Sequence, residues 1–246
     1  MTVTLRLGHL YSEAMNVYGD RGNVIALQRR SEARGIPLEV HRVGVEEELD
    51  LSGLDILLVG GGQDGEQMRV AADLASKGEQ VRLAVDAGMP MLAVCGGFQL
   101  FGTKYVDEGG AELTGIGVFD MVTRHPGGRT NRCVGNVVLD TPFGEVVGFE
   151  NHGGRTFLGP GQQPFGTVQH GSGNNTKDHT EGARRLNAIG TYLHGSLLPK
   201  NPKVTDFLLN QALQRKTGEQ VELERLDDSV ELAAHRRAVE VAKRRR

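Results

Sequence analysis

The stretch that most constrains this chain is MLAVCGGFQLFG, residues 91–102. A continuous apolar run, Met91 to Val94, leads into Cys95 and two glycines, and apolar residues resume directly afterwards. This pattern predicts a buried strand, a tight elbow and a helix. A side chain on such an elbow lies beside a helix N-terminus, where backbone N–H groups favour a thiolate. Cys95 is therefore a candidate nucleophile, although a small buried hydrophobic residue that ends a core strand explains the same pattern.

A second apolar strand precedes this elbow and ends in three glycines, DILLVGGG at residues 55–62. No Gly-Lys-Ser/Thr follows, so the spacing is not that of a Walker loop. Glycines let the backbone approach a ligand closely, which suits a phosphate cradle or an oxyanion hole, while a tight turn is the simpler alternative. A helix is predicted over residues 66–86 between the two strands. Strand, helix and strand predict parallel neighbours with a right-handed crossover, which places the glycines and Cys95 at one edge of the sheet.

The N-terminal region adds a β-α-β unit to this arrangement. The pattern predicts a strand over residues 3–7, a helix from Val24 to about Gly35, and a strand over residues 36–43. A polar loop, MNVYGDRG, follows the first strand. Polar residues in and after it serve equally well as turn and cap residues or as members of a site, and they are secondary candidates: Tyr18, Asp20 and Asn23.

After the elbow helix, the pattern changes to short strands separated by turns. Strands are predicted over residues 115–122, 131–140 and 144–149, and their short connections favour antiparallel pairing. Arg132 lies at the start of one of them. An arginine there is most often a solvated edge charge, but a guanidinium also suits two parallel hydrogen bonds to an amino-acid carboxylate. The polar turn that follows, FENHGGRT at residues 149–156, is explained equally well by its own hydrogen bonds.

The last strand is predicted over residues 188–193 and ends at His194, in TYLHG. A lone histidine is usually structural. This one follows a strand and precedes a glycine, as Cys95 does, and a cysteine and a histidine far apart in sequence are the pattern of thiol catalysis. By contrast, His170 and His179 lie at or within a polar surface loop without metal-ligand spacing, so no metal site is predicted.

Composition narrows the class of protein. A net charge of −3 over 246 residues gives no general tendency to bind nucleic acid or membranes. Only two cysteines occur, Cys95 and Cys133, which favours a reducing cytoplasm over a disulfide framework. Eighteen apolar residues never run together, so no membrane span is expected. An amphipathic helix is predicted from Pro202, and the charged segment over residues 223–246 has helical spacing and a basic end of the kind that is usually solvated.

Taken together, the motifs resemble class I glutamine amidotransferases, and specifically their cobyric-acid-synthase-like (CobB/CobQ-type) branch. Within that branch they are similar to the GatD family, the glutaminase subunits of lipid II isoglutaminyl synthases, on six stretches in order: NVYGDRGN, LVGGGQDGEQ, GMPMLAVCGGFQLFG, TNRCVG, GFENHGGRT and GTYLHGSLLPKNP. The similarity runs from about residue 4 to residue 215. It implies an α/β, flavodoxin-like fold with a mostly parallel central sheet, flanking helices and an antiparallel extension. We therefore expect an amidotransferase domain over residues 1–215 and a charged helical tail over residues 216–246.

The resemblance also implies roles for the candidate residues. Cys95 would attack the side-chain amide of L-glutamine, and His194 would accept the thiol proton and later protonate the leaving ammonia. Backbone N–H groups of the oxyanion hole would come from Gly61 or Gly62 and from Gly96. Two further residues would bind the substrate, namely Arg132 and Gln99. No cofactor is expected in this chain, because ATP would be used by a Mur-ligase-like (MurT-type) partner subunit that amidates the α-carboxyl of D-glutamate in lipid II.

One position departs from the wider amidotransferase pattern. Many class I enzymes carry a glutamate two residues after the histidine, where this chain has Ser196. The expected site is therefore a dyad within this chain. Water, a backbone carbonyl or a carboxylate from a partner subunit could orient His194, and our hypothesis is the partner carboxylate. Two other functions stay open at this point: an amidotransferase for another acceptor, such as a corrinoid, and a catalytically silent binding module of the same fold.

Overall fold

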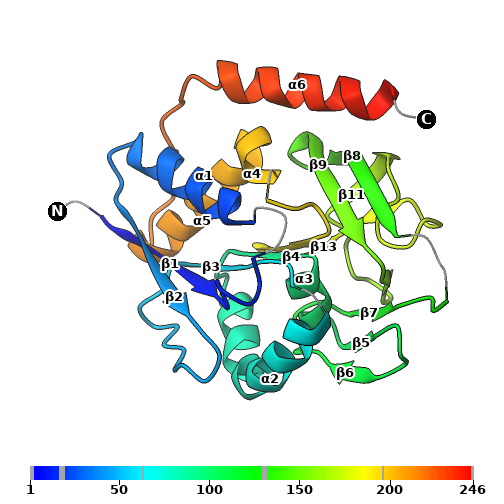
Figure 1. Ribbon diagram of the computed structural model, residues 1–246. Helices are drawn as coiled ribbons and strands as arrows, with labels where there is room; N and C mark the ends of the chain where they lie inside the picture. Colours follow the sequence, from blue (N-terminus) through cyan, green and yellow to red (C-terminus); the bar gives the residue numbers. More distant parts are fainter. Residues whose placement is uncertain (1–2, 17–19, 63, 129–131, 196, 245–246) are drawn as a thin grey trace.

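The computed structural model of the chain describes residues 3–16, 20–62, 64–128, 132–195 and 197–244. Its centre is a six-stranded sheet in the order β13-β14-β4-β3-β1-β2 (Figure 1). All neighbours in it are parallel except β13, which pairs antiparallel with β14. The strands are β1 (Leu5–Leu10), β2 (Leu38–Val43), β3 (Ile56–Val59), β4 (Met91–Val94), β13 (Ala183–Arg185) and β14 (Ala188–Thr191).

Helices cover both faces of this sheet, which explains why β3, β4 and β14 are apolar runs with every residue buried. On one side lie α1 (Arg21–Glu32), α4 (Leu197–Lys200) and α5 (Pro202–Thr217), and on the other lie α2 (Asp64–Asp86) and the short α3 (Gly96–Leu100) (Figure 1). The predicted α/β class, with its mostly parallel sheet and antiparallel extension, is confirmed.

Two smaller sheets form the extension. One is antiparallel in the order β12-β11-β8-β9, and the other has the order β10-β7-β5-β6 with β5 and β7 parallel. Their strands are β5 (Lys104–Val106), β6 (Glu112–Thr114), β7 (Met121–Arg124), β8 (Cys133–Thr141), β9 (Gly144–His152), β10 (Arg155–Leu158), β11 (Gly166–His170) and β12 (Thr180–Glu181). The hairpin of β8 and β9 pairs Cys133 with His152 at its open end, beside the carboxyl edge of the central sheet.

The strand predicted over residues 115–122 is wrong for most of its length, because only Met121 and Val122 belong to a strand. The amides of Ile116 and Gly117 instead donate to carbonyls of Leu100 and Gly102, at the end of the elbow helix. A segment that satisfies its backbone against another turn has no ladder partner of its own. The segment therefore satisfies backbone carbonyls at the C-terminal end of the elbow helix.

The C-terminal segment packs against the body of the protein. Helix α6 (Ser229–Arg244) crosses β8 and β9 (Figure 1), where Val239 and Ala242 bury against Val138 and Val147. Upstream of it, the buried Arg30 of α1 pairs with Asp206 of α5 and Asp228. The expected domain boundary after residue 215 falls within the last turn of α5. Across the described ranges, no helix has the length and apolar character needed to cross a membrane.

Candidate active site

Cys95 occupies the turn between β4 and α3, as the sequence pattern predicts. Its backbone has φ 50° and ψ −105°, a conformation that an L-residue adopts only at a cost of about 1–3 kcal/mol. Two bonds hold this turn in place: the Cys95 amide donates to Thr191 O at 2.8 Å, and the Gly97 amide donates to Gly60 O at 3.1 Å. The elbow is thereby fixed between β14 and the glycine loop that follows β3.

The aromatic ring of Phe98 explains how the elbow helix sits so close to β14. It packs edge-on against Phe119 and Tyr192, with ring centroids 5.8 and 5.3 Å away. A Cβ atom on Gly190 would lie 2.2 Å from the Phe98 ring, so this strand position requires a glycine. The apolar residues that resume after the elbow are therefore the packing that anchors Cys95.

His194 follows β14 and is buried next to the elbow. Its Nδ1 atom lies 3.4 Å from Asp20 Oδ1. Burial alone would lower the pKa of His194, but hydrogen bonding with Asp20 and with Cys95 outweighs it and raises the pKa to about 10. The imidazole is therefore cationic at neutral pH. A histidine cation beside a cysteine is an arrangement that stabilises a thiolate nucleophile.

The position of Asp20 corrects our expectation that the site is only a dyad within this chain. Asp20 is fully buried at the start of α1, and it reaches His194 from the opposite end of the sequence. The other secondary candidate in the described part of this region, Asn23, accepts the amide of Leu198 at 3.0 Å and so caps the short helix after His194. Tyr18 and Ser196 lie outside the described residues.

Asp20 also changes the expected oxyanion hole. Its Oδ2 atom accepts the Gly61 N–H at 2.6 Å, which removes Gly61 from the predicted donors. Gly62 remains, and its nitrogen lies 2.9 Å from the point where a Cβ of Gly96 would stand. Within the described ranges, neither Gly62 N–H nor Gly96 N–H bonds to a protein acceptor. Two neighbouring N–H groups beside a cysteine are suited to bind an oxyanion.

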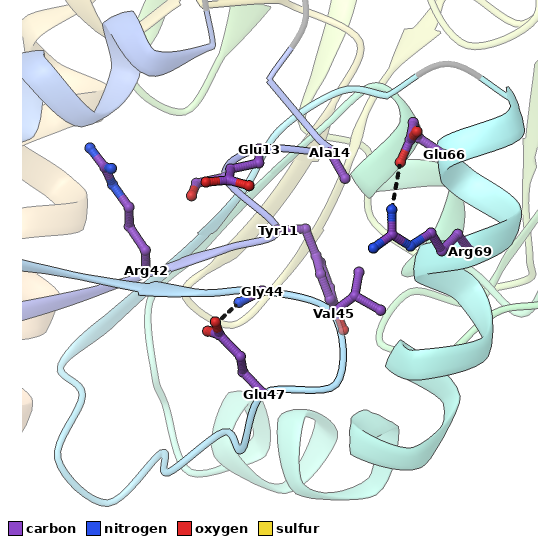
Figure 2. Close-up of a pocket in the computed structure, with 10 residues that line it drawn as sticks. Tyr11, Glu13, Ala14, Arg42, Gly44, Val45, Glu47, Glu66 and Arg69 are labelled. Carbon is purple, nitrogen blue, oxygen red and sulfur yellow. Dashed lines mark hydrogen bonds and ion pairs between the residues drawn. The ribbon is translucent and has the colours of Figure 1, made fainter.

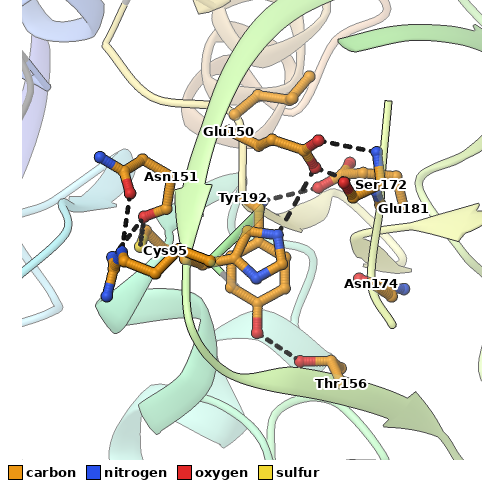
Figure 3. A network of polar contacts seen from close by, with 12 residues as sticks. Cys95, Glu150, Asn151, Thr156, Ser172, Asn174, Glu181 and Tyr192 are labelled. Atoms are coloured by element: carbon orange, nitrogen blue, oxygen red, sulfur yellow. Dashed lines mark hydrogen bonds and ion pairs between the residues drawn. The ribbon is translucent and has the colours of Figure 1, made fainter. Parts of the chain in front are cut away.

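Asn151, which lies beside Cys95 in Figure 3, also binds Arg132. Arg132 Nε donates to Asn151 Oδ1 at 3.0 Å, and Arg132 Nη2 donates to Asn151 O at 3.1 Å. The same carbonyl oxygen lies 3.9 Å from Cys95 Sγ. The guanidinium is therefore oriented at the edge of the site, and its expected contact with a substrate carboxylate stays a prediction.

Gln99, the other predicted substrate residue, is almost fully buried under the elbow. Its Oε1 accepts from Gln67 Nε2 at 3.1 Å, and its Nε2 donates to Tyr192 Oη at 3.3 Å. The tyrosine hydroxyl continues to Thr156 at 2.6 Å (Figure 3). Both ends of the Gln99 amide are thus engaged by the protein, and its role toward substrate also stays a prediction.

A second buried polar cluster packs against the ring of Tyr192. His152 stacks on this ring with centroids 3.6 Å apart, and His152 Nε2 lies 3.6 Å from Glu150. Burial lowers the pKa of His152. Burial also raises the pKa of Glu181 to about 8, although that carboxyl accepts the Tyr192 amide and the Thr191 hydroxyl. The cluster is held by neutral or paired groups, which lets it remain buried.

Sequence reasoning missed Gln67, Asn151 and Tyr192 as parts of the site. All three lie in motifs quoted above: Gln67 ends LVGGGQDGEQ and falls in the first turn of α2, Asn151 lies in GFENHGGRT, and Tyr192 lies in GTYLHGSLLPKNP. The segment predicted as a polar turn is shorter than expected, because β9 runs to His152 and β10 begins at Arg155. Only pairing in space shows which polar residues of these motifs face the thiol.

A separate hollow of about 410 Å³ lies at the carboxyl ends of β1 and β2 (Figure 2). Charged residues of both signs line it, among them Glu13, Arg42 and Arg69, and it includes neither Cys95 nor His194. Nowhere in the described parts of the chain do three or more histidine, cysteine, aspartate or glutamate side chains gather as metal ligands would.

Comparison with known proteins identifies the family of the chain. The model of the CobB/CobQ-like glutamine amidotransferase domain matches residues 6–202. The chain is 39% identical over 246 residues to the lipid II isoglutaminyl synthase (glutamine-hydrolyzing) subunit GatD of Staphylococcus aureus, covering 98% of both chains. It is 38% identical to the protein of the same name from Streptococcus pneumoniae, over 91% of this chain and 86% of that protein.

Solved structures share the fold at low sequence identity. A glutamine amidotransferase from Thermotoga maritima matches with a TM-score of 0.53 and 13% identity, over 97% of this chain and 93% of that one. The glutaminase domain of Trypanosoma brucei CTPS matches with a TM-score of 0.54 and 14% identity, over 89% and 96%.

Proposed function

Because the chain belongs to the family of CobB/CobQ-like glutamine amidotransferase domains, we propose that it hydrolyses L-glutamine to glutamate and ammonia with Cys95 as nucleophile and His194 as acid and base. The observation that carries this proposal is the meeting of three side chains from distant parts of the sequence, Cys95, His194 and Asp20, at one edge of the central sheet. A catalytically silent module would have no reason to retain this arrangement. In this proposal, residues 1–215 form the catalytic domain.

The first half of the reaction forms a thioester. The Cys95 sulfur attacks the side-chain amide carbon of glutamine, and the carbonyl oxygen becomes an oxyanion bound by the N–H groups of Gly62 and Gly96. The imidazolium of His194 then donates its proton to the amide nitrogen, the C–N bond breaks, and ammonia leaves. The products of this step are ammonia and a γ-glutamyl thioester on Cys95.

The second half releases glutamate. Neutral His194 takes a proton from water, the water oxygen attacks the thioester carbon, and the C–S bond breaks to return the Cys95 sulfur. Asp20 keeps the imidazole oriented in both halves and stabilises its cationic form. Arg132 would hold the α-carboxylate of the substrate by two hydrogen bonds, which accounts for a guanidinium fixed beside the thiol.

The acceptor of the ammonia follows from the relatives. Both GatD proteins are named as subunits of a glutamine-hydrolysing lipid II isoglutaminyl synthase, and each is aligned over nearly its whole length. We propose that this chain is the corresponding glutaminase subunit, in a heterodimer with a Mur-ligase-like partner that uses ATP to activate the α-carboxyl of D-glutamate in lipid II. That role places the chain in the cytoplasm, where the partner has access to ATP.

Two measurements test this proposal. The purified chain, alone and with its co-purified partner, is incubated with L-glutamine while ammonia is recorded, with Cys95→Ser as the inactive control. We expect ammonia from the wild type and none from Cys95→Ser. Equal rates of ammonia release by the wild type and Cys95→Ser would refute the thiol mechanism. The complex is then given ATP, glutamine and either lipid II or a corrinoid carboxylic acid, and mass spectrometry identifies which product carries the new amide.

A further inference from the structure

Three consecutive glycines are a poor support for an oxyanion hole unless something else fixes them. Glycine populates both halves of the φ range, so the peptide between Gly61 and Gly62 is free to flip in isolation. That peptide carries the Gly62 N–H, which has to face the thiol for the proposed mechanism. The structure contains one bond on each side of it. On the N-terminal side, the Gly61 N–H donates to Asp20.

Gln67 supplies the bond on the C-terminal side. It lies in the first turns of α2 with only 2% of its surface exposed. Its Nε2 donates one proton to Gly62 O at 3.2 Å and the other to Gln99 Oε1 at 3.1 Å. Because both facing atoms are oxygens, the orientation of the Gln67 amide is set by chemistry. A single NH₂ group therefore links the glycine loop to the elbow helix.

The same amide lies against the elbow itself. A Cβ atom on Gly96 would stand 2.2 Å from Gln67 Nε2, so the amide lies against the Cα of that glycine. On the other side, Gln99 begins a series of buried hydrogen bonds: Gln99 bonds to Tyr192, Tyr192 to Thr156, and Thr156 to Thr123. Gln67 thus connects the two N–H donors, Gly62 and Gly96, to a rigid buried scaffold.

Stability does not explain why a glutamine occupies this position. Its Oε1 is buried and has no hydrogen-bond partner among the residues that the structure describes, an arrangement that destabilises a folded protein. We propose that Gln67 is a positioning residue that holds the Gly62 N–H toward the oxyanion formed at Cys95. This inference rests on the proposed glutaminase function and deepens it, since it explains how a flexible loop becomes a preorganised donor.

Three variants test this role in the complex of the chain with its ligase partner. Gln67→Glu keeps the shape but removes both donated protons, and Gln67→Met keeps the length without polar atoms. Gln80→Glu is the matched control, because Gln80 is exposed on the same helix. Ammonia release is measured against glutamine concentration, and active sites are counted by stoichiometric alkylation of Cys95 with 6-diazo-5-oxo-L-norleucine.

We expect both Gln67 variants to lower kcat per titrated site by about 10- to 100-fold, with KM changed less than about 2-fold, because only the transition state uses the hole. Gln80→Glu should match the wild type. The positioning role is overturned if Gln67→Met keeps kcat within about 2-fold, which would make Gln67 a space-filling residue. It is also overturned if KM rises as much as kcat falls. Failure of the proposed function is distinguishable, since the wild-type complex would then release no ammonia.

Discussion

The carboxylate of Asp20 contacts the imidazole of His194 across 174 positions of sequence, with 3.4 Å between Oδ1 and Nδ1. Its second oxygen accepts the Gly61 N–H at 2.6 Å. One buried side chain therefore orients the base and fixes the glycine loop at the same time. The carboxylate that orients His194 therefore comes from the start of α1, far from the residues that follow the histidine.

Replacing Asp20 by Asn should lower kcat of glutamine hydrolysis by about 10- to 100-fold, since a hydrogen bond to a charged group contributes about 1.5–3 kcal/mol. The carboxylate raises the pKa of His194, so the variant should also lose activity at a lower pH on the alkaline side of its profile. The measurement is kcat/KM from pH 6 to pH 10.5, with the exposed Asp50→Asn as control. An unchanged alkaline limb would contradict the assignment of Asp20.

A methyl group on Gly96 should close the oxyanion hole. It would stand 2.2 Å from Gln67 Nε2 and 2.9 Å from the Gly62 nitrogen, so at least one donor has to move. We expect Gly96→Ala to lower kcat by about 100- to 1000-fold, the range seen when one oxyanion donor is lost. Gly65→Ala is the control, because a Cβ there meets nothing within 4 Å. Comparable rates for the two variants would mean that Gly96 has no part in the hole.

Arg132→Lys tests the recognition of the substrate carboxylate. Lysine keeps the positive charge but loses the planar fork that contacts Asn151 and suits a carboxylate. We expect KM for glutamine to rise by about 10-fold or more while kcat changes less, because the contact is made equally in the ground and transition states. Initial rates over a wide range of glutamine concentration give both constants. A fall in kcat at unchanged KM would place Arg132 in the chemical step instead.

Glu181 should make the protein less stable as pH rises. Burial raises its pKa from 4.5 to about 8, so the folded protein holds a proton that the unfolded chain has already released. The stabilising contribution is fully present below pH 4.5 and is lost as pH rises toward 8. Glu181→Gln should make the free energy of unfolding depend less on pH over this range, and the variant should be more stable than the wild type at pH 8. Urea unfolding at pH 5, 6.5 and 8 measures the free energy of unfolding of both proteins. The same pH dependence in both would disprove the claim.

The order of strands and helices around the site follows from sequence patterns that depend on near neighbours. An apolar run that ends at Cys95 predicts β4 and the elbow because both faces of a parallel strand are buried. The same reasoning located the glycine loop after β3 and His194 after β14. It was least successful between residues 103 and 124, where it missed β5 and β6 and placed a strand over residues whose amides instead bond to the end of the elbow helix.

What the sequence determined by itself is the fold family and the pair of residues, Cys95 and His194, that we propose as nucleophile and base, because each stands in a local motif. Only the tertiary structure decided that Asp20 faces the histidine, that Gly61 is already bonded, and that Gln67 links the loop to the elbow. These relationships depend on the packing of α1 and α2 against opposite faces of one sheet. No local period in the chain encodes which side chains such packing brings within hydrogen-bond distance.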